Sequence, residues 1–193
     1  MNGLCRTTDS RSRFGSGKLP LVRGRATARP YHEEICAVKI REFKSSIWLP
    51  IPPDELFPFF GDAANLDAIT PSWLHFKIVT PQPIEMKEGA LIDYRLRVRG
   101  LPLRWRTRIN VWKPPHRFVD EQLRGPYRQW IHEHTFEERD GGTFATDKVK
   151  YAVPFDFLLH PFFVGPDIQK IFRHRSDSLK KIFTDQPASS TAH

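Results

Sequence analysis

The sequence predicts an α+β domain in which a curved antiparallel β-sheet wraps around one long C-terminal α-helix. Residues 92–153 hold segments that alternate apolar and polar side chains between Gly or Pro turns, as in an antiparallel sheet with one solvated face. Residues 165–183 instead repeat apolar side chains at helical spacing and form the longest predicted helix. Because this helix must bury its apolar face, the apolar face of the sheet is its expected partner.

The chain before residue 92 is predicted to hold one strand, two short helices and a second strand. The first strand is expected over residues 38–49, where β-branched and aromatic residues are frequent. Pro53 followed by two acidic residues is typical of a first helical turn, and Pro58 keeps this helix short. A second short helix is expected over residues 63–69, and residues 73–80 are expected to form a strand.

The meander that follows is predicted to consist of five strands. They are expected over residues 92–99, 104–112, 118–124, 128–136 and 143–153, with turns at residues 100–102 and 125–126. Residues 155–164 are expected to form an apolar loop that leads into the C-terminal helix.

One face of the strand over residues 128–136 combines aromatic side chains with two imidazoles. Side chains alternate between the faces of a strand, so Trp130, His132, His134 and Phe136 point the same way. This amphipathic wall and the opposing helix predict an internal cavity for a small ligand, with the 155–164 loop over its mouth. The residues expected to line it are Tyr94, Trp105, Trp130, His132, His134, Tyr151, Ile168 and Phe172, and Ile171 lies on the same helix face.

The imidazole pair leaves three chemical interpretations open. His132, His134 and Asp147 are the candidates for acid–base catalysis. Their spacing is also compatible with a metal site, but zinc needs a third ligand and no CxxC or HExxH motif accompanies the pair, so no metal is predicted. Histidines that are only hydrogen-bonded within the sheet are the third possibility.

The run Asp120-Glu121-Gln122 must place at least one carboxylate on the inner face of its strand, because neighbouring side chains alternate. A buried carboxylate needs a partner, and Arg124, His132 or Arg106 could provide one. The carboxylate either anchors a ligand, takes part in acid–base chemistry, or belongs to a structural ion-pair network.

Arginines gather on the outer face of the hairpin that follows residue 92. They are Arg95, Arg97, Arg99, Arg104, Arg106 and Arg108. This face is compatible with peripheral contact with an anionic membrane. The aromatic residues that single-stranded nucleic acid needs lie on the opposite face, so no nucleic acid is predicted. The alternative is a solvated surface whose arginines pair with acids such as Glu121 and Glu133.

The net charge of +8 is unevenly distributed, because residues 1–35 hold seven basic and three acidic residues. These residues lack large apolar groups and are predicted to be a disordered basic extension or the product of a start assigned too early, with an organellar transit peptide as the alternative. The folded domain is expected over residues 36–185 and a disordered tail over 186–193. Two cysteines do not suggest a disulfide framework, and no apolar run approaches the ~20 residues of a membrane-spanning helix. A cytoplasmic location is expected.

Three strings carry a resemblance to a known superfamily: IWLPIPPDELFPFF, LPLRWRTRINVWKPPHRFVDEQLRGPYRQWIHEHTF and GGTFATDKVKYAVPF. With the order of elements over residues 38–184, they resemble the START-like (SRPBCC) superfamily of polyketide cyclases, plant pollen-allergen proteins and coenzyme Q-binding START domains, and within it a bacterial branch known by fold alone. The resemblance implies the helix-grip fold and the binding or carriage of a lipid, quinone or polyketide-like ligand. Because fold does not fix function, a cyclase or dehydratase is the alternative. No cofactor and no obligate protein partner are expected.

Overall fold

The computed structural model describes residues 38–184. The predicted extension over residues 1–35 and the predicted tail over residues 186–193 lie outside the described residues. Within the described range, every helix is too short or too polar to cross a bilayer. The expected cytoplasmic location stays a prediction.

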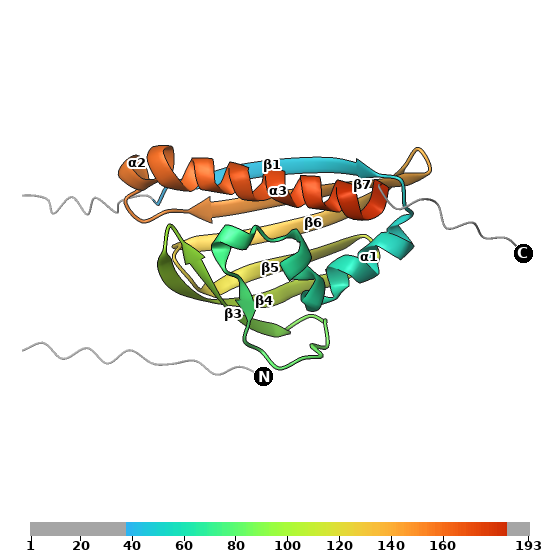
Figure 1. The fold of residues 1–193 in the computed structure, drawn as a ribbon, viewed down its shortest axis with the longest axis horizontal. Coiled ribbons are helices and arrows are strands. Elements are labelled where there is room, and N and C mark those ends of the chain that lie inside the picture. The colour runs from blue at the N-terminus through green and yellow to red at the C-terminus, as the bar shows by residue number, and fades with distance from the viewer. Residues whose placement is uncertain (1–37, 185–193) are drawn as a thin grey trace, which may run out of the picture. The chain divides into compact units, whose positions relative to one another are not determined.

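A seven-stranded antiparallel sheet forms the body of the domain (Figure 1). Its strands are β1 (Ile40–Leu49), β2 (Lys77–Ile78), β3 (Leu91–Val98), β4 (Leu101–Lys113), β5 (Arg117–Arg124), β6 (Gln129–Arg139) and β7 (Gly142–Ala152). They lie in the order β1-β7-β6-β5-β4-β3-β2, so the first strand pairs with the last and the others form the predicted meander. Two register shifts between β4 and β5 help to bend the sheet.

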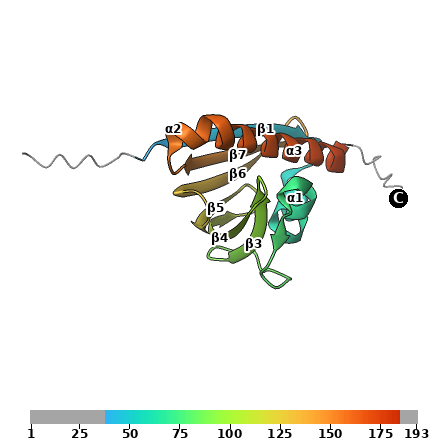
Figure 2. The same ribbon diagram turned by 60° about the vertical axis from the view of Figure 1, so that its left-hand side comes forward.

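The helices gather on one face of this curved sheet (Figure 2). They are α1 (Pro53–Gly61), the 3₁₀ segments η1 (Ala63–Ile69) and η2 (Ser72–Leu74), α2 (Asp156–Leu159), the π-helical turn η3 (His160–Val164) and α3 (Gly165–Thr184). α3 contacts β1, α1 contacts β6 and β7, and η2 contacts β3. The predicted helix-grip architecture is thus confirmed.

Two separate clusters of buried side chains hold α3 against the sheet. Leu179, near its C-terminal end, packs with Leu49 and Phe118 in one cluster. Ile168, near its N-terminal end, packs with Val149 in the other. Full burial of one such side chain contributes ~1.5–3 kcal/mol, so the helix is fixed near both ends.

The turn between β3 and β4 differs slightly from the sequence-based expectation. Arg99 and Gly100 form it with φ values of 51° and 83°, and β4 already begins at Leu101. A two-residue hairpin loop favours positive φ at both central positions, and glycine adopts such a φ without strain. The turn therefore comes one residue earlier than predicted, and Leu101 becomes part of the strand.

Two predicted segments have a different conformation in the structure. Residues 155–164 were expected to form a loop, but α2 and η3 make the segment from Asp156 onward helical, because the inward side chains of Leu159 and Val164 pack against the cluster around Val149. Residues 73–80 were expected to form a strand, but only Lys77–Ile78 pairs with β3. The left-handed backbone of His75, with φ of 44°, ends η2 and interrupts the extended conformation.

A partly buried ion pair joins the first turn of α2 to β1. Arg41 donates from Nε and Nη2 to the two carboxylate oxygens of Asp156 at 2.6 and 2.8 Å. The hydrogen bonds from Arg41 hold the pKa of Asp156 below its ordinary value of 3.8. A carboxyl group with a lowered folded-state pKa stabilises the fold above its ordinary pKa and loses that contribution as the pH falls through the lower value.

We therefore expect Asp156→Asn to melt at a lower temperature than the wild type at neutral pH, and at the same temperature once the pH lies below the folded-state pKa. Circular dichroism melting curves over an acidic pH series measure this difference. Asp177→Asn, at an exposed position on α3, is the matched control and should behave like the wild type. A stability difference that stays constant down to the most acidic pH would contradict the role of the ion pair.

Candidate functional site

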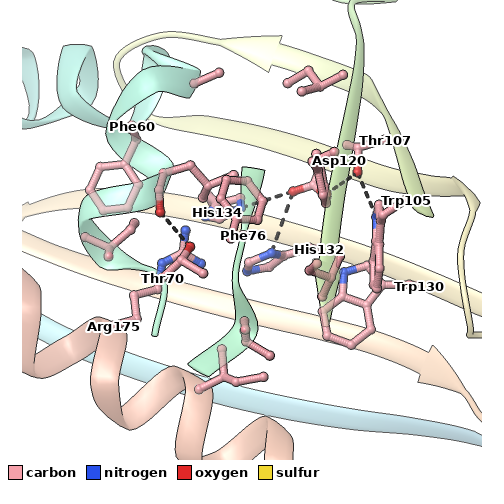
Figure 3. Close-up of a pocket in the computed structure, with 18 of the residues that line it drawn as sticks. Phe60, Thr70, Phe76, Trp105, Thr107, Asp120, Trp130, His132, His134 and Arg175 are labelled. Carbon is pink, nitrogen blue, oxygen red and sulfur yellow. Dashed lines mark hydrogen bonds and ion pairs between the residues drawn. The ribbon is translucent and has the colours of Figure 1, made fainter. Parts of the chain in front are cut away.

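An internal cavity of about 230 Å³ lies between the curved sheet and the helices (Figure 3). Its wall is mostly apolar and comes from β3, β4, β5 and β6 of the sheet and from α1, η1, η2 and α3. Ile171 and Phe172 close it from the helix side, while Leu96 and Val98 face it from β3. The cavity exists because α3 is packed against the sheet near its two ends, and the strands curve away from it between β6 and β3.

Aromatic side chains form one end of this cavity. The indole rings of Trp105 and Trp130 meet edge to face with centroids 5.5 Å apart, and Tyr127 lies 4.7 Å from Trp130. The Thr107 hydroxyl accepts a hydrogen bond from Trp105 Nε1 at 3.0 Å and lies 2.7 Å from the Tyr94 hydroxyl. Burial raises the pKa of Tyr94, so its hydroxyl stays protonated and available as a donor.

Two carboxylates and two imidazoles meet on the inner face of the three neighbouring strands β5, β6 and β7. The strand register places Asp120 opposite His132 and Asp147 opposite His134, so both pairs lie on the same face. Asp147 Oδ1 lies 2.9 Å from both His132 Nε2 and His134 Nδ1. Asp120 Oδ2 lies 3.2 Å from His134 Nε2 and 3.6 Å from His132 Nδ1. We call these four side chains the Asp–His cluster.

Arg175 brings a positive charge from α3 to this cluster. Its Nη1 lies 3.4 Å from Asp147 Oδ1, and its guanidinium carbon lies 5.8 Å from the centre of the Phe172 ring. Its Nε is buried and has no hydrogen-bond partner among the described residues. Arg175 therefore partly balances a carboxylate that is largely removed from water, and it lines the cavity beside the cluster (Figure 3).

The pKa values of the two imidazoles are shifted in opposite directions. Burial and the neighbouring His134 lower the pKa of His132. Burial also acts to lower the pKa of His134, but the hydrogen bonds to Asp120 and Asp147 outweigh it and raise that pKa. For Asp147, burial is opposed by the charge of Arg175 and by both histidines, which hold its pKa well below the ordinary range. The two histidines therefore differ: His132 favours its neutral form, whereas His134 holds a proton more readily than a free imidazole does.

The structure brings most of the expected ligand-binding residues together. Tyr94, Trp105, Trp130, His132, His134, Ile168 and Phe172 all line the cavity. Tyr151 does not: it packs in the cluster around Val149, and its hydroxyl lies 2.9 Å from His160 Nε2. Asp147 lies behind the two histidines rather than on the cavity wall, and no residue of the 155–164 segment reaches the cavity. The expectation that this segment covers the mouth is therefore wrong.

The polar run on β5 divides as alternation requires, although not with all the expected partners. Asp120 turns inward to the histidines, while Glu121 turns outward and pairs with Arg108 at 3.1 Å. Arg106 does not reach Asp120, because it forms a two-pronged ion pair with Asp93 on the outer face. Glu133, expected to pair with the arginine hairpin, instead binds Arg117 at 2.6 Å.

Arg175 is the main site residue that sequence reasoning missed. Its position continues the helical stripe of Ile168, Ile171, Phe172 and Leu179, so a charged residue stands where an apolar one is expected. This exception to the pattern was a signal that α3 carries a buried charge toward the sheet.

Comparison with known proteins agrees with this geometry. A family match over most of the chain, together with the helix-grip fold, places the protein in the START-like superfamily. A sequence model of the family described as polyketide cyclase / dehydrase and lipid transport matches residues 49–180, and the chain belongs to that family. Among curated proteins, none matches the sequence.

Several solved structures share the fold. Protein Ms6760 from Mycobacterium smegmatis is 16% identical with a TM-score of 0.58, covering 76% of this chain and 92% of its own. Protein CV1439 from Chromobacterium violaceum is 13% identical with a TM-score of 0.59, covering 74% and 96%. The major latex-like protein 151 of Panax ginseng is 10% identical with a TM-score of 0.58, covering 77% and 99%. At these identities the likeness concerns the fold alone.

Removal of the guanidinium next to the Asp–His cluster should destabilise the fold. Arg175→Met keeps an unbranched side chain but leaves Asp147 without its cationic partner, and breaking a largely buried pair costs about 3 kcal/mol. Urea unfolding of the variant measures this loss. Arg173→Met, at an exposed position on the same helix, is the matched control. Equal stability of the two variants would show that Arg175 does not balance the buried carboxylate.

Proposed function

We propose that this protein binds and carries a small amphipathic molecule in the cavity between the sheet and α3. The observation that carries the proposal is the division of the cavity into an apolar, aromatic part and one polar end formed by Asp120 and the two histidines. A small-ligand site needs this combination, because apolar area supplies affinity and a few fixed polar groups supply orientation.

The size of the cavity favours a compact ligand. A volume of about 230 Å³ lies below the ~300–1,000 Å³ that is usual for ligand pockets. A single ring system of the quinone or aromatic polyketide type fits this space better than a lipid with two long chains. Its ring would lie between Trp105, Trp130 and the aliphatic side chains of β3.

The polar end would orient such a ligand through oxygen atoms. The guanidinium of Arg175 and the imidazole of His134, whose pKa is raised, favour carbonyl, phenolate or carboxylate oxygens. The hydroxyl groups of Thr107 and Tyr94 can exchange hydrogen bonds with an uncharged oxygen of the ligand. A ligand with oxygen substituents at one edge of a ring would offer hydrogen-bond partners to Arg175 and His134 and also to the Thr107–Tyr94 pair. A plain hydrocarbon would leave the polar end without partners.

Filling the cavity tests the proposal directly. Leu96→Trp places a large side chain on the cavity wall and should weaken binding of the apolar fluorophore 1-anilinonaphthalene-8-sulfonate at least about tenfold, which corresponds to ~1.4 kcal/mol. Leu91→Trp, at an exposed position of the same strand, is the matched control. Native mass spectrometry of purified wild type, followed by extraction, should identify the natural ligand, and Leu96→Trp should not retain it. Equal binding by the two variants would place the fluorophore elsewhere.

An acid–base enzyme of the cyclase or dehydratase type is the second candidate. The observation that favours it is the free nitrogen of His132: its Nδ1 lies 3.6 Å from Asp120, beyond hydrogen-bond distance, and its lowered pKa leaves it neutral. A neutral imidazole on a cavity wall can accept a proton from a bound substrate.

The two candidates differ in their response to His132→Gln. A carrier should keep most of its affinity for the extracted ligand, because apolar contacts dominate binding. An enzyme should keep substrate binding but lose turnover by the ~10²–10⁴-fold that a general base contributes. Chromatography of the extracted ligand after incubation with each protein measures turnover. Conversion of the ligand by wild type and not by the variant would decide against a simple carrier.

A lipid surface is the proposed source of the ligand, and the segment from Phe155 to Val164 is the proposed contact. It exposes five apolar side chains: Phe155 (68%), Phe157 (81%), Leu158 (52%), Phe162 (67%) and Phe163 (41%). The arginine hairpin adjoins it, because the Arg99 guanidinium lies 4.8 Å above the Phe163 ring and pairs with Asp167. The cavity wall reaches the same end of the sheet through Val98.

Only part of the arginine face has charge available for such contact. Arg106 and Arg108 are engaged with acids on the sheet, whereas Arg95, Arg97 and Arg104 are exposed and form no ion pair within residues 38–184. Aromatic side chains next to basic ones match the boundary and head-group regions of an anionic bilayer. The proposed contact therefore combines the helical segment with the tip of the hairpin.

Vesicle binding separates the two contributions. Phe157→Asp with Phe162→Asp should abolish sedimentation with vesicles of phosphatidylcholine and phosphatidylserine. Arg97→Glu with Arg104→Glu should weaken it mainly at low salt, since screening removes the electrostatic part. Arg106→Glu with Arg108→Glu is the control for charge reversal at paired positions. The membrane contact would be rejected if the phenylalanine variant still bound vesicles. It would also be rejected if the wild type formed dimers in a concentration-dependent way and the phenylalanine changes abolished them.

A further inference from the structure

The Asp–His cluster is asymmetric, because the imidazoles lie closer to Asp147 than to Asp120. On the Asp147 side, both imidazoles lie at hydrogen-bond distance, 2.9 Å from the same oxygen. On the Asp120 side, the separations are 3.2 and 3.6 Å, and the longer one exceeds a hydrogen bond. One ring nitrogen of each histidine and one oxygen of Asp120 thus converge loosely, and all three atoms lie within 4.8 Å of one another.

These looser separations have the dimensions of a metal site. Imidazole nitrogen and carboxylate oxygen bind Zn²⁺ at about 2.0–2.1 Å, so two ligand atoms of a tetrahedral site lie about 3.3 Å apart. The separations of Asp120 Oδ2 from His134 Nε2 and His132 Nδ1 lie on either side of that value. These two separations match those between ligand atoms of one ion, and the third pair lies within 4.8 Å.

The opposite side of the cluster supplies what such a site needs around it. Histidines that bind a metal through one nitrogen commonly donate from the other nitrogen to a carboxylate, which fixes the tautomer and the ring orientation. Asp147 Oδ1 is placed to accept in this way, 2.9 Å from both His132 Nε2 and His134 Nδ1. Arg175 holds the same Asp147 oxygen from α3 at 3.4 Å. The two carboxylates therefore differ in their roles: Asp120 lies on the looser side of the imidazoles, and Asp147 holds their orientation from the other side.

The geometry points to a binding site for a divalent transition-metal ion formed by Asp120, His132 and His134, with Asp147 as the residue that positions both histidines. Two nitrogen ligands and one oxygen ligand suit Zn²⁺ or Fe²⁺. The three ligands line the cavity, whereas Asp147 lies behind them. The remaining coordination position therefore faces the cavity, where an oxygen atom of a bound molecule can occupy it.

This site rests on the cluster rather than on the proposed carriage of a ligand, and it would refine that function by naming an oxygen donor as the head of the ligand.

The test uses untagged full-length protein that has been stripped with EDTA. Isothermal titration with Zn²⁺ should show one site per chain, and Co²⁺ should give the visible absorption of a tetrahedral complex. Asp120→Asn and His134→Ala should lose this binding, whereas His116→Ala, an exposed histidine outside the cluster, should keep it. Asp147→Asn should retain the stoichiometry and weaken binding by about 10–100-fold, as expected for a residue that orients ligands.

A second measurement does not depend on variants that fold. X-ray absorption at the zinc edge of the loaded wild type should show two imidazoles and oxygen ligands at about 2.0–2.1 Å. Sulfur ligands, or Zn²⁺ binding that survives both Asp120→Asn and His134→Ala, would place the metal elsewhere. If none of Zn²⁺, Co²⁺ and Fe²⁺ binds stoichiometrically, the cluster is a hydrogen-bonded network only and the proposal is overturned. Leu96→Trp should still bind metal, so failure of the metal site and failure of the ligand cavity can be told apart.

Discussion

The burial of four ionisable side chains on β5, β6 and β7 is the constraint on which the rest of the site depends. Asp120, His132, His134 and Asp147 are largely removed from water, and each is tolerable only because the others are within reach. The register of three strands is therefore coupled to charge balance. A slip by one residue would turn the cluster to the outer face and bring Glu121, Glu133 and Lys148 inside.

The same constraint extends to the helix. Arg175 must lie over Asp147, and the apolar residues on either side of it, Ile168 and Leu179, pack into separate clusters of the sheet. Between these two attachments the sheet bends away, and the space is left to a cavity that is polar at one end and aromatic at the other. Stability and ligand binding thus share one element, since the helix that closes the fold also forms one wall of the site.

Periodicity made the fold and much of the site predictable. Alternation along residues 128–136 placed Trp130, His132 and His134 on one face, and the helical repeat placed Ile168 and Phe172 opposite them. What it could not supply was the pairing between strands, which decides that Asp120 and Asp147 flank the histidines from opposite sides. It also misplaced Tyr151, because the end of β7 lies under the 155–164 segment, whose helical form depends on tertiary packing of Leu159 and Val164. Short segments of this kind take their conformation from the surface they cover.

The pairing of β1 with β7 has a consequence for the way the domain forms. Ile40 lies opposite Ala152, so the first strand has no partner until nearly the whole sheet has been synthesised. The buried side chains of Leu49, Leu56 and Phe57 can meet Phe118 and Phe136 earlier, but Ala145 and Leu179 complete their cluster only later in the chain. Contacts of such large sequence separation slow folding. On the ribosome, β1 therefore stays without a strand partner until β7 has emerged, and the cluster around Leu49 is complete only when α3 follows, so the two ends of the domain come together last.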